Sequence, residues 1–115
     1  MSEHGGSINA LVTLSNGNLA SGSDDKTIKI WNTTTGLLVY KLNEHTGSVN
    51  TLVSLSNGNL ASGSTDFTVK IWDPIITGTL LFTLTGHAGG VYSLATLSND
   101  NLASGSDDNT IKIWC

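Results

Sequence analysis

A window of 18 residues occurs three times in this sequence and determines how the chain is organised. It runs from Leu14 to Trp31 and returns at 55–72 with three substitutions and at 97–114 with two. The three tryptophans that end the windows are spaced by 41 and 42 residues, and so are the only three histidines. A period of about 40 residues is typical of proteins that stack copies of one small unit. We therefore expect residues 1–115 to form one domain of three repeats, at approximately 3–43, 44–85 and 86–115.

Each repeat predicts β-structure throughout. In the first repeat, segments 8–14, 18–23, 27–31 and 37–42 are rich in apolar and β-branched residues and are separated by short turn sequences. Asn16-Gly17 joins the first two segments, and Asn-Gly is the strongest short signal for a β-hairpin. No window has helical periodicity. The repeat is therefore predicted to be a four-stranded antiparallel meander, the size of one propeller blade.

Short motifs recur at fixed places in these repeats. Gly86-His87 is varied to Glu3-His4 and Glu44-His45, and the sequence LASGS is followed two residues later by Asp in every copy. The dipeptide Trp72-Asp73 is varied to Trp31-Asn32 and Trp114-Cys115. In these motifs the chain closely resembles the WD-repeat β-propeller family over nearly its whole length. The resemblance implies an all-β fold of propeller blades.

The resemblance also implies a role for the repeated polar residues. Blades of this family contain a hydrogen-bonded tetrad of histidine, serine or threonine, aspartate and tryptophan. Each copy here has a complete set, and the three sets are His4, Ser21, Asp25 and Trp31; His45, Ser62, Asp66 and Trp72; and His87, Ser104, Asp108 and Trp114. Bonds to an ionised aspartate are stronger than neutral ones. We therefore expect these residues to hold the fold together.

Two chemical functions for the same residues, hydrolysis and calcium binding, are less well supported than the structural role. Serine, histidine and aspartate also make a hydrolase triad, but a triad is recognised by its geometry at a cleft. The carboxylate pairs Asp24-Asp25 and Asp107-Asp108 lack the spacing of a calcium loop, and Thr65 replaces the first of them in the second copy. We therefore predict no enzyme activity, no catalytic residue, no metal site and no cofactor.

Composition excludes several classes of partner. The net charge is −4, and the five basic residues are all lysines, which argues against nucleic-acid binding. No apolar run is long enough for a membrane helix, and residues 1–10 do not resemble a signal peptide. The single cysteine fits a reducing compartment, so we expect a cytoplasmic protein. Lys29, Lys70 and Lys112 occupy one position of each repeat and are expected to be exposed.

The third repeat stops after its third predicted strand. We therefore expect an incomplete propeller of three blades, the last without its outer strand. Both end blades are expected to expose an apolar face, with Ile8 and Leu11 at one end and Val91 and Leu94 at the other. Exposed patches of this kind usually mark an interface. Copies of the chain could close a ring of six or nine blades, or the chain could be part of a longer propeller.

The family resemblance implies a scaffold that binds other proteins. By analogy, the exposed binding positions lie three and five residues after each histidine and one before each tetrad aspartate. They are Ser7, Asn9, Asp24, Ser48, Asn50, Thr65, Gly90, Tyr92 and Asp107. Tyr92 is the best anchor among them, because aromatic side chains concentrate binding energy, although it could equally pack between blades. The alternative function is a lectin-like oligomeric propeller, which would need exposed aromatic rings at its sugar pockets.

Overall fold

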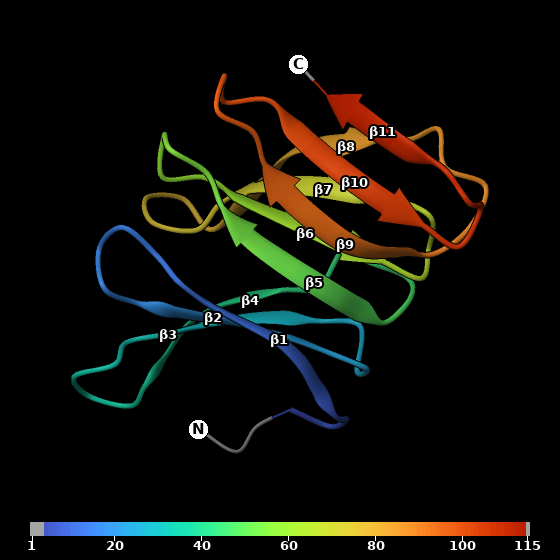
Figure 1. Cartoon of the computed structure of the whole chain (residues 1–115). Helices are drawn as coiled ribbons and strands as arrows, with labels where there is room; N and C mark the ends of the chain where they lie inside the picture. Colours follow the sequence, from blue (N-terminus) through green and yellow to red (C-terminus); the bar gives the residue numbers. More distant parts are fainter. Residues whose placement is uncertain (1–3, 115) are drawn as a thin grey trace.

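A computed structural model describes residues 4–114 as three stacked antiparallel sheets (Figure 1). Glu3 and Cys115, which complete two of the sequence motifs, lie outside the described residues. The first sheet contains β1 (Ile8–Thr13), β2 (Leu19–Ser23), β3 (Ile28–Trp31) and β4 (Leu38–Leu42). The second contains β5 (Val49–Ser54), β6 (Leu60–Ser64), β7 (Val69–Asp73) and β8 (Thr79–Leu84). The third contains β9 (Val91–Thr96), β10 (Leu102–Ser106) and β11 (Ile111–Trp114).

Each sheet is a meander in which sequence neighbours pair, as the turn signals predict. The β1–β2 hairpin closes through a bond from Leu14 N–H to the Asn18 carbonyl, and Gly17 takes the required positive φ of 88°. Asp100 occupies the glycine position in the third sheet with a φ of 65°, and its hairpin keeps the same backbone bonds. The β9–β10–β11 sheet has three strands among the described residues. Within residues 4–114 no helix is long or apolar enough to span a membrane.

The core consists of two apolar layers, one at each junction between sheets. Ala20, Ile28 and Ile30 of the first sheet pack against Val49 and Leu60 of the second. The equivalent residues Ala61, Val69 and Ile71 of the second sheet pack with Val91 and Leu102 of the third. Glycine allows close approach at both places. A Cβ added to Gly22 would lie 2.7 Å from Val49 Cγ1, and one added to Gly63 would lie 2.7 Å from Val91 Cγ1.

The prediction of which residues form the open faces is correct for the first sheet and wrong for the third. Ile8 and Leu11 are exposed, as expected, but Val91 is fully buried and Leu94 packs on the second core cluster. These two side chains of β9 face the second sheet. The uncovered face of the third sheet is formed by β10 and β11 instead, where Ile111 and Ile113 are 76% and 55% exposed.

The prediction for the repeated lysines is also wrong for two of the three. Lys29 and Lys70 are buried, and Lys70 Nζ donates to Thr83 Oγ1 at 3.0 Å. Both residues lie on inner strands, with a paired strand on either side. Lys112 lies on the edge strand β11 and is half-buried. A long aliphatic stem can be buried in this way while the ammonium group reaches a polar partner.

Candidate functional site

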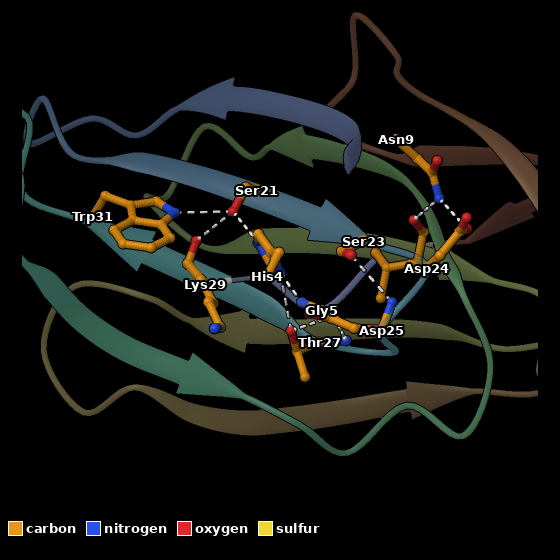
Figure 2. Close-up of polar contacts among 11 residues, drawn as sticks. His4, Gly5, Asn9, Ser21, Ser23, Asp24, Asp25, Thr27, Lys29 and Trp31 are labelled. Carbon is orange, nitrogen blue, oxygen red and sulfur yellow. Dashed lines mark hydrogen bonds and ion pairs between the residues drawn. The ribbon is translucent and has the colours of Figure 1, made fainter. Parts of the chain in front are cut away.

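The repeated polar cluster is built on the turn after the second strand of each sheet. In the first sheet, Asp25 follows β2, and its Oδ1 accepts bonds from the Thr27 N–H at 3.0 Å and the Thr27 hydroxyl at 2.6 Å. Such local bonds from the chain to an aspartate are what stabilise a tight turn. Its second oxygen, Oδ2, is left facing His4 and the Gly5 N–H. The turn therefore aims one carboxylate oxygen at the histidine (Figure 2).

A chain of three bonds, beginning with the one to His4, links this carboxylate to the tryptophan. His4 Nδ1 lies 2.8 Å from Asp25 Oδ2, and His4 Nε2 lies 2.6 Å from Ser21 Oγ. The Trp31 indole N–H donates to the same serine oxygen at 2.9 Å. Each group is satisfied when the serine hydroxyl donates to Nε2 and the Nδ1–H of a neutral imidazole donates to the aspartate. The chain of bonds thus joins β2, β3 and the segment before β1 (Figure 2).

The other two sheets repeat this geometry. His45 lies 2.7 Å from both Asp66 Oδ2 and Ser62 Oγ, and the Trp72 indole donates to Ser62 at 2.8 Å. In the third sheet the His87–Asp108 and His87–Ser104 distances are 3.0 and 2.7 Å, and the Trp114–Ser104 distance is 2.8 Å. The structure therefore brings all twelve tetrad residues of the sequence analysis into three hydrogen-bonded chains.

Burial and hydrogen bonding have opposite effects on the pKa of the tetrad carboxylates. Burial would raise the pKa of Asp25 and Asp66, but bonds from the threonine two residues on and from the histidine lower it more. The Thr110 hydroxyl is the main group that keeps the pKa of Asp108 low. Burial lowers the pKa of His45 below its usual 6.5, despite the Asp66 carboxylate beside it. The second sheet therefore holds a neutral histidine against an ionised aspartate.

This arrangement stabilises structure and gives no access to a substrate. Ser21, Ser62 and Ser104 are at most 2% exposed, and each hydroxyl is already bonded to both a histidine and a tryptophan. A nucleophilic serine must be reachable at a cleft. Among residues 4–114, no group of three His, Cys, Asp or Glu side chains could hold a metal ion.

A fifth residue belongs to each cluster and was not singled out in the sequence. Thr27, Thr68 and Thr110 donate both a backbone N–H and a hydroxyl to the tetrad aspartate. The signal was present, because every copy contains Asp, one variable residue and Thr in succession. The variable residue takes a positive φ, and in the second copy it is Phe67, with a φ of 77°.

The predicted partner-binding positions lie beside these turns, but the side chains of three of them, Asn9, Asp24 and Asn50, already have partners within the chain. Asn9 Nδ2 donates to Asp24 Oδ1 at 2.8 Å and to the Val49 carbonyl at 3.1 Å (Figure 2). Asn50 Nδ2 donates in the same way to the Val91 carbonyl at 3.1 Å. These amides therefore connect each sheet to the next one.

The third sheet has Tyr92 at this position, and its ring takes a different place. The ring lies over Gly90, where a Cβ would be 2.9 Å from Tyr92 Cε2 and 3.3 Å from Thr65 Cα. Gly90 was expected to be exposed, but it is buried, because the tyrosine covers it. Thr65, Gly90 and Tyr92 thus come together across the second junction, and Tyr92 remains 49% exposed. Of the other positions, Ser7, Asp24 and Asp107 are exposed and Ser48 is half-buried.

Comparison with known proteins agrees with this geometry. The family described as "WD domain, G-beta repeat" matches residues 1–32, 36–73 and 78–115. The crystal structure of the WD40 beta propeller domain of Doa1 superposes with a TM-score of 0.91 and 29% sequence identity. That alignment covers 99% of this chain and 38% of the Doa1 chain, so the sequence spans well under half of the solved propeller. No curated protein matches the sequence.

Proposed function

The chain belongs to the WD-repeat family, and on this premise we propose that it is a non-catalytic scaffold that completes its ring with copies of itself and binds other proteins. Propellers of this family generally bind proteins and are generally not catalysts. The observation that carries the proposal is the chemical match between the two open faces of the chain. Each open face has the residues that are buried at an internal junction.

We call the face of each sheet that carries Ala20, Ile28 and Ile30, or their equivalents, its front face, and the opposite face its rear face. The front face of the third sheet repeats the front faces of the first two. Ala103, Gly105, Ile111 and Ile113 occupy the positions of Ala20, Gly22, Ile28 and Ile30. In the first sheet all of these apolar side chains are buried under the second sheet. In the third sheet Ile111 and Ile113 are uncovered.

The rear face of the first sheet repeats the rear faces of the other two. Ile8 and Leu11 occupy the positions of Val49 and Leu52, which pack in the first core cluster. They are 51% and 61% exposed. Covering apolar surface stabilises an assembly by about 25 cal/mol per Å². A second copy that docks its rear face on the front face of the first would therefore reproduce a junction that the chain already forms twice.

Ring closure limits the number of copies. Closed propellers have about four to eight blades, and two copies would supply six sheets. Three copies would supply nine. A head-to-tail contact that does not close produces open filaments, so we propose a closed ring and not a filament.

The mass in solution tests this proposal. Light scattering should give two or three times the chain mass of 12.0 kDa, and Gly105→Val should convert the assembly to a folded monomer. Within the chain the nearest atom to a Cβ at Gly105 is Ser93 Cβ at 3.8 Å, so the substitution has room in the monomer. At a reproduced junction the same Cβ would meet Ile8. A wild-type mass of 12.0 kDa at tens of micromolar protein, or a multimer unaffected by the valine, would refute self-association.

We further propose that other proteins bind beside the tetrad turns, with Tyr92 as the anchor. Tyr92 is the large exposed side chain among the nine positions of the sequence analysis, and the rest are small or polar. Tyr92→Ala should retain the fold and lose affinity for a partner, whereas Ser7→Ala should change neither. If a partner bound the Tyr92→Ala and Ser7→Ala proteins equally well, Tyr92 would not be the anchor.

A further inference from the structure

The two junctions between sheets differ beside the tetrad turns, although the repeated windows are nearly identical. Windows 14–31 and 55–72 differ at three positions, and two of these lie in the turn that follows the second strand. The residues that approach this turn from the next sheet differ as well. The first junction carries Asp24, Lys26, Ser48 and Asn50 at these four positions, and the second carries Thr65, Phe67, Gly90 and Tyr92. The substitutions therefore gather at one place, where two aromatic rings replace charged and polar side chains.

The substituted residues of the second junction lie together. A Cβ added to Gly90 would be 3.3 Å from Thr65 Cα and 2.9 Å from Tyr92 Cε2. Phe67 follows Thr65 by two residues in the same turn, so their Cα atoms are at most about 8 Å apart. Phe67 and Tyr92 are 48% and 49% exposed. Two half-exposed aromatic side chains thus flank Thr65 between two sheets that pack on each other.

The tyrosine also leaves a carboxylate without a partner. In the first sheet Asn9 Nδ2 donates to Asp24 Oδ1 at 2.8 Å. The equivalent residues of the third sheet are Tyr92 and Asp107, and within residues 4–114 the Asp107 carboxylate has no hydrogen bond or ion pair. The Asp107 N–H donates to the carbonyl of Gly90, which the tyrosine covers, at 3.0 Å. Asp24 is also exposed although the second sheet covers its own sheet, so exposure is a property of this turn position.

The turn holds Phe67 in an unfavourable backbone conformation. Its φ is 77°, a value that bulky residues rarely adopt. Lys26 and Asn109 take the same conformation in the other sheets with polar side chains. The Phe67 ring is half-exposed and belongs to neither apolar core cluster. Packing within the described residues therefore does not account for an aromatic residue here, and strained residues concentrate at functional sites.

The region around the two rings is acidic. Segments 64–68, 86–92 and 106–110 contain Asp66, Asp107 and Asp108 and no lysine or arginine. An aromatic face attracts a cation that lies within about 6 Å of the ring centre. A carboxylate attracts the same cation and repels an anion. The rings and the free carboxylate of Asp107 are therefore complementary to a cationic group.

We propose that Tyr92, Phe67 and Asp107 bind a lysine or arginine side chain from a basic segment of a partner protein. The site depends on the proposed scaffold function and gives its anchor, Tyr92, a chemical class of partner. The cationic group lies over the Tyr92 ring and pairs with Asp107, and its aliphatic stem packs on Phe67. An exposed ion pair alone contributes little, so the rings provide most of the selectivity. The first junction lacks both rings and does not form this site.

Nuclear magnetic resonance of protein with labelled aromatic rings tests the site directly. The chain has two tyrosines and two phenylalanines, so Tyr92 and Phe67 report on the site and Tyr40 and Phe82 are internal controls. The probe is a short peptide of glycine and serine, blocked at both ends, with a single central lysine. We expect saturable shifts of the Tyr92 and Phe67 signals and none at Tyr40 and Phe82. The same peptide with acetyl-lysine should bind at least about tenfold more weakly, because acetylation removes the charge.

Matched variants separate the site from general attraction to an acidic protein, and in each of them a remaining ring reports binding. Tyr92→Leu should weaken binding about tenfold, whereas Tyr92→Phe, which keeps the ring, should retain it. Asp107→Asn should weaken it about two- to fivefold. Glu44→Gln removes the same charge from an exposed residue at the first junction and should leave the affinity unchanged. Phe67→Asn should weaken binding and raise the melting temperature, a combination that a purely structural residue would not give.

The proposal is overturned if the shifts at Tyr92 and Phe67 are absent, are matched at Tyr40 and Phe82, or are unchanged by acetylation of the lysine. Equal affinities of the Asp107→Asn and Glu44→Gln proteins would also overturn it, because binding would then follow net charge alone. The scaffold proposal fails separately, if the chain is a monomer or if a partner binds the Tyr92→Ala protein unchanged. A partner that needs Tyr92 but presents no basic side chain to it would refute this site alone.

Discussion

Strands β3 and β11 have the same four residues and opposite environments. In both, the sequence is Ile-Lys-Ile-Trp. Ile28 and Ile30 of β3 are fully buried, whereas Ile111 and Ile113 of β11 are 76% and 55% exposed. β3 has a strand on each side and a sheet packed on its isoleucines, and β11 is an edge strand on an uncovered sheet. The difference shows that burial in this fold is determined by the neighbouring sheet and not by the strand itself.

The largest expected effect comes from truncating the same isoleucine in the two environments. Ile30→Ala leaves a cavity in the first core cluster and should reduce the free energy of unfolding by about 2–5 kcal/mol. Ile113→Ala removes an exposed side chain and should cost less than about 1 kcal/mol. Urea unfolding of both variants in the Gly105→Val background, where we expect the chain to be monomeric, would measure the two values. Equal losses would mean that the front faces are equally buried.

The next largest difference in stability is expected between Gly63→Ala and Gly105→Ala, which change the same motif position in the second and third sheets. A Cβ at Gly63 would lie 2.7 Å from Val91 Cγ1, so Gly63→Ala must push the sheets apart and should cost about 1–3 kcal/mol. Gly105→Ala has an open environment and should change the stability of the monomer little. Thermal unfolding of each variant would measure the difference. If Gly105→Ala destabilised the monomer as much as Gly63→Ala does, the third sheet would be covered by something within the chain.

The buried histidine of the second sheet should make stability depend on pH. The pKa of His45 is lowered on folding, so the unfolded chain binds a proton more readily than the native chain. The resulting contribution to stability is complete above the unfolded pKa of about 6.5 and is lost as pH falls through the folded value. The carboxyl of Asp66, with a folded pKa below 3.8, adds a further loss at lower pH.

Denaturation midpoints measured from pH 7 to pH 5 would test this dependence. We expect the wild-type midpoint to fall over this range and the slope to be reduced in His45→Gln. A matched His4→Gln variant would show how much of the slope belongs to the second sheet. A midpoint that rises as pH falls would contradict the assignment of a neutral His45.

The smallest expected effect concerns the turn beside the second tetrad. Phe67 holds a positive φ of 77°, whereas Asn109 occupies the same position in the third sheet at 68°. Asparagine tolerates this conformation much better than a bulky residue does. Phe67→Asn should therefore raise the free energy of unfolding by about 0.5–1 kcal/mol, and Asn109→Phe should lower it similarly. An unchanged melting temperature in both variants would argue against strain at this turn.

The strands could be predicted from the sequence because they depend on local, repeated signals, and turn residues such as Asn16-Gly17 fix the hairpins. The tetrads could be predicted because the resemblance to the WD-repeat family implies them, and the structure forms all three. An open face on the third sheet was predicted, but which of its two faces is open was predicted wrongly. The assignment of Val91 and Leu94 to the open face was wrong because they occupy the positions of Ile8 and Leu11, and equivalent positions of stacked sheets face the same way, which in the third sheet is toward the second.

The burial of Lys29 and the covering of Gly90 were missed for a related reason. Lysine is usually exposed, and only the position of β3 inside a paired sheet buries this one. Gly90 and Tyr92 differ together from their counterparts Ser48 and Asn50. The glycine makes room for the tyrosine ring, and this pairwise fit becomes visible only when the two side chains are placed.

An engineered disulfide between copies tests the central claim that the open faces form a third junction of the same kind. At the first junction a Cβ on Gly22 would lie 3.3 Å from Val49 Cβ, close to the separation of about 3.5–4.5 Å in disulfides. Ile8→Cys with Gly105→Cys, in a Cys115→Ser chain, should therefore form covalent dimers or trimers under mild oxidation. Gly22→Cys with Val49→Cys is the control and should crosslink within one chain. A chain that stays monomeric under conditions in which the control pair crosslinks fully would contradict the claim.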